Sequence, residues 1–325
     1  MRSHEKTQLA ASPRESRRPG RISYPSPSVD PATASSDLEG ALEIFSSVQG
    51  RLFGIAYRML GSASDAEDIV QEVWVRWQGC DRTVVREPAA FLATTTTHLA
   101  LNMMTSARAR HEAYVGPWLP EPIDTGVNPE LAAESEETLE VGLLFLLERL
   151  SPVERAAYVL REAFDYPYAQ IAAIVGVEEA NARQLVSRAR KHLATEKHPP
   201  VGVSEQRRFL EAFLSAAQTG DIEGLETIFS DDIVSYSDGG GTRQAARIPL
   251  VGRPRVVKFV AAVSVWFWDG VDVQWIEANG RAALRLVAND QTFALLTVSA
   301  SAQGIDQLFW MVNPAKLDKI MPAVA

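Results

Sequence analysis

The apolar positions of the first two thirds of the chain recur at the spacing of α-helices. The run "LFGIAYRMLGSASDAEDIVQEVWVRW" starts at Leu52, and "EPAAFLATTTTHLALNMMTSARARHEAY" starts at Glu87. From residue 137 the runs "ETLEVGLLFLLERL", "SPVERAAYVLREAF", "PYAQIAAIVGV" and "EEANARQLVSRARKHL" follow with short breaks. Spacings of three and four residues between apolar positions are typical of amphipathic helices, so this part of the chain is predicted to be all-α.

Beyond "HPPVG" at residues 198–202 the pattern changes from helical to alternating. One amphipathic helix, "SEQRRFLEAFLSAAQTG", precedes β-rich runs at residues 232–238, 271–280, 282–290, 292–301 and 304–313. Asn-Gly, Asn-Asp and Gly turns separate these runs, as in an antiparallel sheet packed on helices. The predicted fold class is a multidomain protein of two all-α helical domains and one α+β domain.

Two segments fit neither pattern. Residues 1–37 are rich in Ser, Pro and Arg and are predicted to form a disordered tail. The stretch "YVGPWLPEP" at residues 114–122 holds Trp118 and Leu119 between prolines, which exclude a helix. These two apolar side chains are expected to dock on another surface, with local packing of Trp118 as the alternative.

The overall composition indicates an ordinary globular protein. The 325 residues are 46% hydrophobic and 22% charged, as in ordinary globular proteins. The single cysteine, Cys80, excludes an intramolecular disulfide and suits a reducing cytoplasm. The sequence shows neither a membrane-spanning apolar run nor a secretory signal, so a cytoplasmic location without membrane contact is expected.

Charge is unevenly distributed along the chain. Residues 116–150 hold eight acidic residues and one arginine, which is −7 of the net charge of −9. Residues 180–193 instead hold three arginines and one lysine without any acid. Because a phosphate backbone responds to the local patch, the net charge does not exclude binding to nucleic acid.

Residues 168–193 are predicted to form a helix-turn-helix. Ile171, Ile174 and Val175 share one face of the first helix, and Gly176 permits the tight turn. The opposite face of the second helix carries side chains that can reach base edges and phosphates in the major groove. These candidates for DNA contacts are Asn181, Arg183, Gln184, Ser187, Arg188 and Lys191. A helical hairpin with a solvated basic face is the alternative.

At this point two stretches resemble a known family. "LSPVERAAYVLREAFDYPYAQIAAIVGVEEANARQLVSRARKHL" resembles region 4 of bacterial extracytoplasmic-function (ECF) sigma factors, and the run from Leu52 resembles their region 2. The resemblance implies region 2 at residues 38–115, an acidic linker at 116–137 and region 4 at 138–197. It also implies that region 4 reads the −35 promoter element and that region 2 reads the −10 element and binds core RNA polymerase.

Region 2 supplies two sets of candidate residues. Asp65, Asp68 and Glu72 share one helix face with Gln71 at its edge, and the resemblance implies that this face docks on the largest polymerase subunit. A simply solvated acidic face is the alternative. The candidates for the single-stranded −10 element are Arg82, Arg86, Thr95, Thr96, Asn102, Arg108 and Arg110. The chain has "TTHLALN" where the family usually has "ARNLALD", and Thr95 and Thr96 are alternatively plain helix-surface residues.

Residues 203–325 resemble the SnoaL-like branch of the NTF2-like fold, a cone-shaped sheet closed by helices. In enzymes this fold holds a small molecule and an acid/base residue, but no histidine or cysteine follows Gly202. An aspartate base would have to be Asp238, Asp272 or Asp290, and no paired acid accompanies them. The domain is therefore not expected to be an enzyme, and neither a cofactor nor a metal is expected.

Three short motifs place the chain closer still. "WLPEP", "DGGG" and "NPAKL" match motifs of the SigJ-type subgroup, in which the SnoaL-like domain is fused to regions 2 and 4. The resemblance implies a regulatory interface within the chain. Its expected residues are Trp118, Leu119, Pro120, Glu121, Asp238, Gly239, Gly240, Gly241, Asn313, Pro314, Lys316 and Leu317.

The leading interpretation is an ECF-type sigma factor that recruits core polymerase to promoter DNA and is modulated in cis by its C-terminal domain. Two alternatives from other classes remain open at this point: a ligand-sensing DNA-binding regulator that acts without core polymerase, and a SnoaL-like enzyme with helical appendages.

Overall fold

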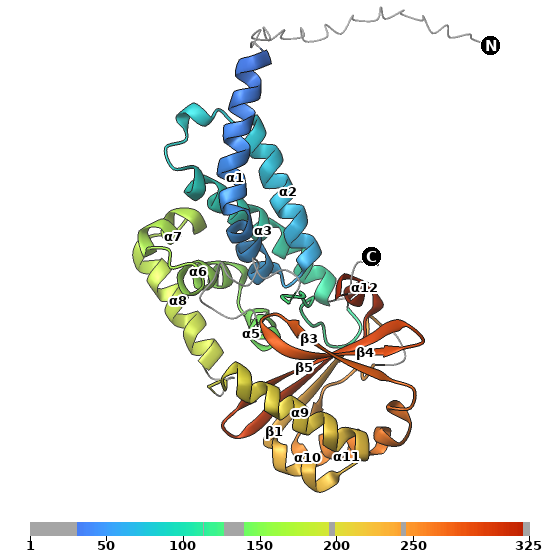
Figure 1. The fold of residues 1–325 in the computed structure, drawn as a ribbon. Coiled ribbons are helices and arrows are strands. Elements are labelled where there is room, and N and C mark those ends of the chain that lie inside the picture. The colour runs from blue at the N-terminus through green and yellow to red at the C-terminus, as the bar shows by residue number, and fades with distance from the viewer. Residues whose placement is uncertain (1–30, 113, 127–139, 195–198, 242–244, 321–325) are drawn as a thin grey trace, which may run out of the picture.

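The structure is a computed structural model that describes residues 31–112, 114–126, 140–194, 199–241 and 245–320. Two helical units lie toward one end, and a twisted sheet with its covering helices lies toward the other (Figure 1). The chain leaves the first helical unit through the linker at residues 114–126, which passes beside the sheet before the second helical unit begins. Within the described ranges no helix combines the length and apolar character that a membrane crossing requires.

The first helical unit consists of α1 (Pro31–Leu60), α2 (Ala63–Gly79), the short η1 (Arg82–Val84) and α3 (Pro88–Glu112). Helix α1 begins at Pro31, inside the segment expected to be a tail. The Ser62 hydroxyl accepts the backbone N–H of Asp65 and starts α2, as an N-cap does. Trp77 is almost fully buried, and its indole N–H donates to the Ala41 carbonyl at 3.0 Å, which fixes α2 against α1.

The second helical unit consists of α5 (Val141–Leu147), α6 (Pro152–Glu162), α7 (Tyr168–Val175) and α8 (Glu179–Ala194). Ser151 and Glu154 form a capping box that starts α6. Gly176 ends α7 with φ = +71°, a left-handed conformation that glycine adopts without strain. Helices α7 and α8, joined by the turn at Gly176, therefore form the predicted helix-turn-helix.

The C-terminal unit is built on one six-stranded sheet. Its elements are α9 (Val203–Thr219), α10 (Ile222–Ile228), β1 (Phe229–Asp238), β2 (Leu250–Val251), α11 (Arg253–Phe267), β3 (Asp272–Ala278), β4 (Arg281–Ala288), β5 (Gln291–Ser301), β6 (Gly304–Met311), α12 (Pro314–Leu317) and η2 (Asp318–Ile320). The strand order is β2-β1-β6-β5-β4-β3, in which β1 and β6 pair in parallel and the other neighbours are antiparallel. The five alternating runs were predicted, whereas α10, α11 and the short β2 were not.

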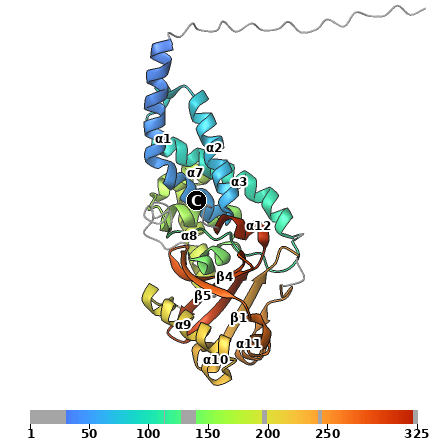
Figure 2. The ribbon, with the colours of Figure 1, turned by 45° about the vertical axis from the view of Figure 1, so that its right-hand side comes forward.

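Both faces of this sheet are covered. Helices α9, α10 and α11 pack on one face through a core that includes Leu210, Phe213 and Val260. A second core on the other face joins Leu119 from the linker and Val141 from α5 to the sheet residues. Figures 1 and 2 show α9 to α11 at the end of the molecule far from α1. The fold is thus two all-α units plus one α+β sheet domain, which is the fold class predicted from the sequence.

Candidate functional site

The linker at residues 114–126 is part of the C-terminal core. Leu119 is fully buried in a cluster with Tyr236, Leu295 and Leu317. Prolines on both sides keep the segment extended, so the side chain of Leu119 can enter the sheet face without a helix around it. Pro120 is buried with it, and Trp118 is half-buried.

The carboxylate of Asp238, at the end of β1, accepts hydrogen bonds from the linker. Its carboxylate is fully buried; Oδ2 accepts the backbone N–H of Leu119 at 2.9 Å and the ammonium of Lys316 at 2.7 Å. Oδ1 accepts from the Tyr114 hydroxyl and from the Gly240 N–H at 3.2 Å. A buried carboxylate needs this degree of compensation, because an unpaired charge in the interior is strongly unfavourable.

Lys316 completes the contact from α12. Its Nζ also donates to the Leu119 carbonyl at 2.5 Å and lies 4.1 Å from the centre of the Trp118 ring, a cation–π distance. Burial lowers the pKa of Lys316, and the neighbouring Asp238 carboxylate opposes that shift. The Leu119 carbonyl and the Trp118 indole therefore both contact the ammonium group of Lys316. The WLPEP, DGGG and NPAKL motifs thus meet at the ion pair of Asp238 and Lys316.

The glycines and Asn313 give this contact its geometry. Gly240 has φ = +59°, and a Cβ atom there would lie 2.8 Å from the Asn313 side chain, so a larger residue does not fit. Asn313 caps α12 by accepting from Ala315 N at 3.2 Å, and its Nδ2 donates to the Tyr114 hydroxyl at 2.9 Å. Burial raises the pKa of Tyr114, and its hydrogen bond to Asp238 raises it further. Gly239 precedes this turn, Gly241 follows it with φ = +86°, and Pro314 occupies the first turn of α12.

The same linker is bound to the first helical unit through Glu121. Its backbone N–H donates to the Gly61 carbonyl at 2.8 Å, and its carboxylate accepts the Ser64 N–H at 3.1 Å in the first turn of α2. The Tyr57 hydroxyl donates to the Glu121 carbonyl at 2.5 Å and accepts from Asn279 Nδ2 at 2.7 Å. Burial raises the pKa of Tyr57. Glu121 thus ties the linker to the start of α2, and Tyr57 connects Glu121 to Asn279 in the turn between β3 and β4.

Beyond Glu121 the linker runs along the edge of the sheet. Ile123 and Asn279 exchange two hydrogen bonds of 2.9 and 3.1 Å. Thr125 N donates to the Glu277 carbonyl at 3.1 Å, and Asp124 forms an isolated antiparallel bridge with Ala278. The segment therefore covers the C-terminal end of the edge strand β3, whose backbone groups would otherwise be unpaired there.

The two helical units share one continuous hydrophobic core. Arg51 of α1 donates from Nη2 to the Phe164 carbonyl at 2.9 Å and stacks 4.8 Å from the centre of the Tyr166 ring. A nitrogen of His98 on α3 lies 2.6 Å from the Ile174 carbonyl of α7. Arg155 of α6 donates to the Met59 carbonyl at 2.7 Å. The structure is therefore a closed arrangement in which the second helical unit packs directly on the first.

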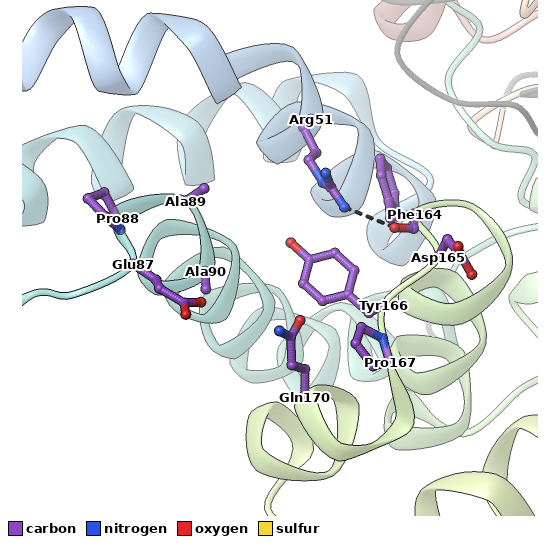
Figure 3. Close-up of a pocket in the computed structure, with 10 residues that line it drawn as sticks. All are labelled: Arg51, Glu87, Pro88, Ala89, Ala90, Phe164, Asp165, Tyr166, Pro167 and Gln170. Atoms are coloured by element: carbon purple, nitrogen blue, oxygen red, sulfur yellow. Dashed lines mark hydrogen bonds between the residues drawn. The ribbon is translucent and has the colours of Figure 1, made fainter.

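The seam between the two units is not filled completely. A cleft of about 380 Å³ lies between α1, the start of α3 and the turn before α7. Figure 3 shows Tyr166 and Gln170 on one side of this cleft and Glu87 to Ala90 on the other. The cleft is therefore lined by residues of both helical units.

The predicted −35 face of α8 is open to solvent. All six candidates, Asn181, Arg183, Gln184, Ser187, Arg188 and Lys191, are exposed. Arg183 pairs with Glu179 at 2.5 Å and Arg188 with Glu154 at 3.3 Å, both at the surface where such pairs hold a side chain only weakly. Leu185 and Val186 face the core as predicted.

The predicted polymerase face of α2 is also accessible. Asp68, Gln71 and Glu72 are exposed, whereas Asp65 is half-buried in the first turn. Glu72 pairs with Arg76 at 2.8 Å one turn further on. The four residues lie together along one helix, and Glu121 of the linker is bound at its first turn.

The candidates for −10 contacts divide into four groups. Thr96 is wrong as a DNA contact in this arrangement, because it is fully buried and its hydroxyl donates to the Leu92 carbonyl at 2.9 Å. Arg82 folds back on the end of α2 and donates to the Trp77 carbonyl at 3.1 Å. Asn102 and Arg86 are exposed and Thr95 is half-buried, all clear of the main core, while the side chains of Arg108 and Arg110 lie outside the described residues.

The three aspartates considered as a catalytic base have different surroundings. Asp238 is engaged by Lys316 and the linker, as described above. Asp272 is exposed and accepts from the Gln274 side chain at 2.6 Å, and Asp290 is exposed in the turn before β5. These positions do not form a paired acid and base.

Sequence reasoning missed several residues that hold the closed arrangement. Tyr57 and Asn279 are 222 positions apart and touch only because the linker brings the units together. Glu140 and Arg281 form an ion pair that is about nine-tenths buried. The Asn-Gly signal at Asn279 predicted a turn, and its φ of +56° agrees, but nothing in that signal indicated a partner.

Comparison with known proteins places the chain. Two family models match it, Sigma-70 region 2 over residues 44–110 and Sigma-70, region 4 over residues 141–193. The ECF RNA polymerase sigma factor SigJ of Mycobacterium tuberculosis is 36% identical over 232 residues, which cover 70% of this chain and 74% of SigJ. The probable ECF RNA polymerase sigma factor SigI of the same species is 27% identical over 273 residues, 83% of this chain and 92% of SigI. The crystal structure of M. tuberculosis SigJ matches with a TM-score of 0.70 and 29% identity, covering 86% of this chain and 98% of that one.

The fold and the two sigma regions define a transcription initiation factor of the sigma-70 type. Within that class, the chain belongs to the extracytoplasmic-function sigma factors.

Proposed function

We propose that this chain directs core RNA polymerase to promoters through the face of α8 and the first helical unit, and that its C-terminal domain restrains it. The observation that carries the proposal is the exposed set of polar and basic side chains on α8 in a chain that belongs to this family. Asp68, Gln71 and Glu72 are the residues proposed to bind core polymerase, with Asp65 at their edge.

The closed arrangement has to open for both promoter elements to be read at once. Elements centred at −35 and −10 lie about 25 base pairs apart, or roughly 85 Å along B-form DNA at about 3.4 Å per base pair. The two helical units instead share a core and contact each other through Arg51, Tyr166 and His98. Separation of α6 and α7 from α1 and α3 is therefore part of the proposed function.

The restraint is proposed to act through the linker. Leu119, Asp238 and Lys316 hold the linker on the sheet, and Glu121 holds it on α2. Because the contacts are intramolecular, their effective concentration is in the millimolar range for short connections, so modest contacts suffice to populate the closed state. Core polymerase that docks on α2 then competes with a segment bound at the start of the same helix.

The test is run-off transcription with core polymerase and this chain. We expect transcripts from a cognate promoter only when the chain is present, and a changed yield when residues 203–325 are removed. Arg188→Ala should weaken −35 binding by about 1–3 kcal/mol if Arg188 reads a base, and discrimination at one position should relax. Arg207→Ala, which removes the same charge from α9, is the matched control and should leave promoter binding unchanged.

Two results would contradict this proposal. Transcription that does not depend on the chain would exclude a promoter-recognition role. Equal loss of binding for Arg188→Ala and Arg207→Ala would mark α8 as a general cationic surface and not as a reader of sequence.

A further inference from the structure

Helix α11 carries an apolar face that nothing in the described part of the chain covers. Val256, Val257 and Val260 are buried against the sheet, which orients the helix. On the solvent side, Phe259 is 41%, Val265 86% and Trp266 65% exposed. Exposed aromatic and branched side chains gathered on one helix face are typical of an interaction surface.

Charges flank this face in a definite order. Arg255 and Lys258 lie toward the start of α11, and Asp269 lies two residues beyond its end. All three are exposed, and among the described residues none of them has an ion-pair partner. From residue 239 to residue 268 the sequence has no acidic residue, so the positive and negative ends of the helix are well separated.

The order of charged and apolar residues along this face is complementary to the same order read backwards, with Ala262 at the centre. A twofold axis at this exposed small residue places Arg255 opposite Asp269 of a second copy, because 262 is the midpoint of 255 and 269. The same axis places Lys258 opposite Trp266 and Phe259 opposite Val265. These three pairs are an ion pair, a cation–π pair and an apolar pair, and each forms twice in an isologous interface. We propose that the solvent face of α11 is the contact surface of a homodimer.

A second copy of the chain is complementary to both the charged and the apolar residues of this face, whereas DNA is complementary only to some of them. DNA would suit Arg255 and Lys258, but its phosphates would be repelled by Asp269. Figures 1 and 2 show α11 at the end of the molecule far from α1 and α2, so a dimer formed there leaves the polymerase face of α2 free. One helix of 15 residues spans about 22 Å, which is small for a permanent interface, so the dimer should be reversible.

The experiment is sedimentation velocity of the full chain over a range of micromolar concentrations at low salt, which limits screening of the charge pairs. We expect a monomer–dimer equilibrium that Trp266→Glu weakens by about tenfold or more. Arg255→Glu places a glutamate against Asp269 of the second copy, and Asp269→Lys places a lysine against Arg255, so each should weaken the dimer. The double variant Arg255→Glu/Asp269→Lys should restore it, because the two charges exchange places.

Val203→Ser is the control, since Val203 is 54% exposed on α9 and is not part of α11, and it should leave the dimer unchanged. A wild-type chain that stays monomeric at every concentration overturns the proposal. A dimer that the single variants leave intact, or that the double variant fails to restore, overturns it as well. A monomer whose affinity for core polymerase falls with Trp266→Glu would assign the face to polymerase and also overturn the homodimer.

Discussion

Replacing Asp238 with alanine should destabilise the closed arrangement by about 3–5 kcal/mol, because it leaves the ammonium of Lys316 buried without a counter-charge. The substitution also removes the acceptor of the Leu119 N–H and the Tyr114 hydroxyl. Hydrogen exchange at the backbone amides of Glu121 and Thr125 measures the opening, since both donate to carbonyls outside the linker. We expect their protection to fall by about 100-fold or more.

The controls separate the ion pair from a general loss of stability. Asp272→Ala removes an exposed carboxylate from the same domain and should change stability by less than about 0.5 kcal/mol. The double variant Asp238→Leu/Lys316→Met removes both charges and should recover much of the loss, since a buried pair replaced by apolar groups is often neutral. Equal exchange in Asp238→Ala and the wild type would show that the pair does not hold the linker.

Shortening Leu119 to alanine should raise the apparent affinity for core polymerase by about 30-fold or more. Truncation of a fully buried leucine costs about 2–5 kcal/mol, and here the loss falls on the closed state, where Leu119 is buried against the sheet. A loss of 2 kcal/mol corresponds to about 30-fold in the ratio of open to closed molecules. Apparent affinity rises with the fraction of molecules that are competent to bind. Equilibrium binding of the labelled chain to core polymerase measures this apparent affinity.

Leu119→Met is the matched control for this change. It keeps nearly the same volume, so the closed state and the affinity for core polymerase should stay close to those of the wild type. If Leu119→Ala folds normally yet binds core polymerase no better than Leu119→Met, the linker does not restrain the sigma regions.

The helical part of the fold could be predicted because its determinants are local. Apolar spacing, the capping box at Ser151 and the left-handed turn at Gly176 each act within a few residues, and the structure has α6, α7 and α8 where they indicate. The strands after residue 231 were predicted from alternation for the same reason. Helix α11 was not predicted, since its solvent face carries Phe259, Val265 and Trp266 between the charged residues, which obscures the alternation of polar and apolar faces.

The site could be predicted only in part, because its contacts join distant segments. The resemblance singled out the motifs that contain Leu119, Asp238 and Lys316. The sequence alone does not show that Asp238 and Lys316 form an ion pair or that this pair binds the backbone of Leu119. Tyr114 and Asn279 belong to the same network and were missed, since a tyrosine before a proline-rich stretch and an asparagine in a turn have no distinctive spacing. Thr96 is fully buried in the closed arrangement, and nothing in the run of four threonines distinguishes it from Thr95, whose hydroxyl also donates to its own helix.

The central claim is that the two sigma regions are closed on each other in the free chain and separate on the promoter. The direct measurement is resonance energy transfer between dyes on Gln78→Cys at the end of α2 and Ala173→Cys on α7, both exposed, in a Cys80→Ser background. We expect efficient transfer in the free chain, less in Leu119→Ala, and almost none once core polymerase and promoter DNA are bound. Efficient transfer that persists in a complex that initiates transcription would contradict the account.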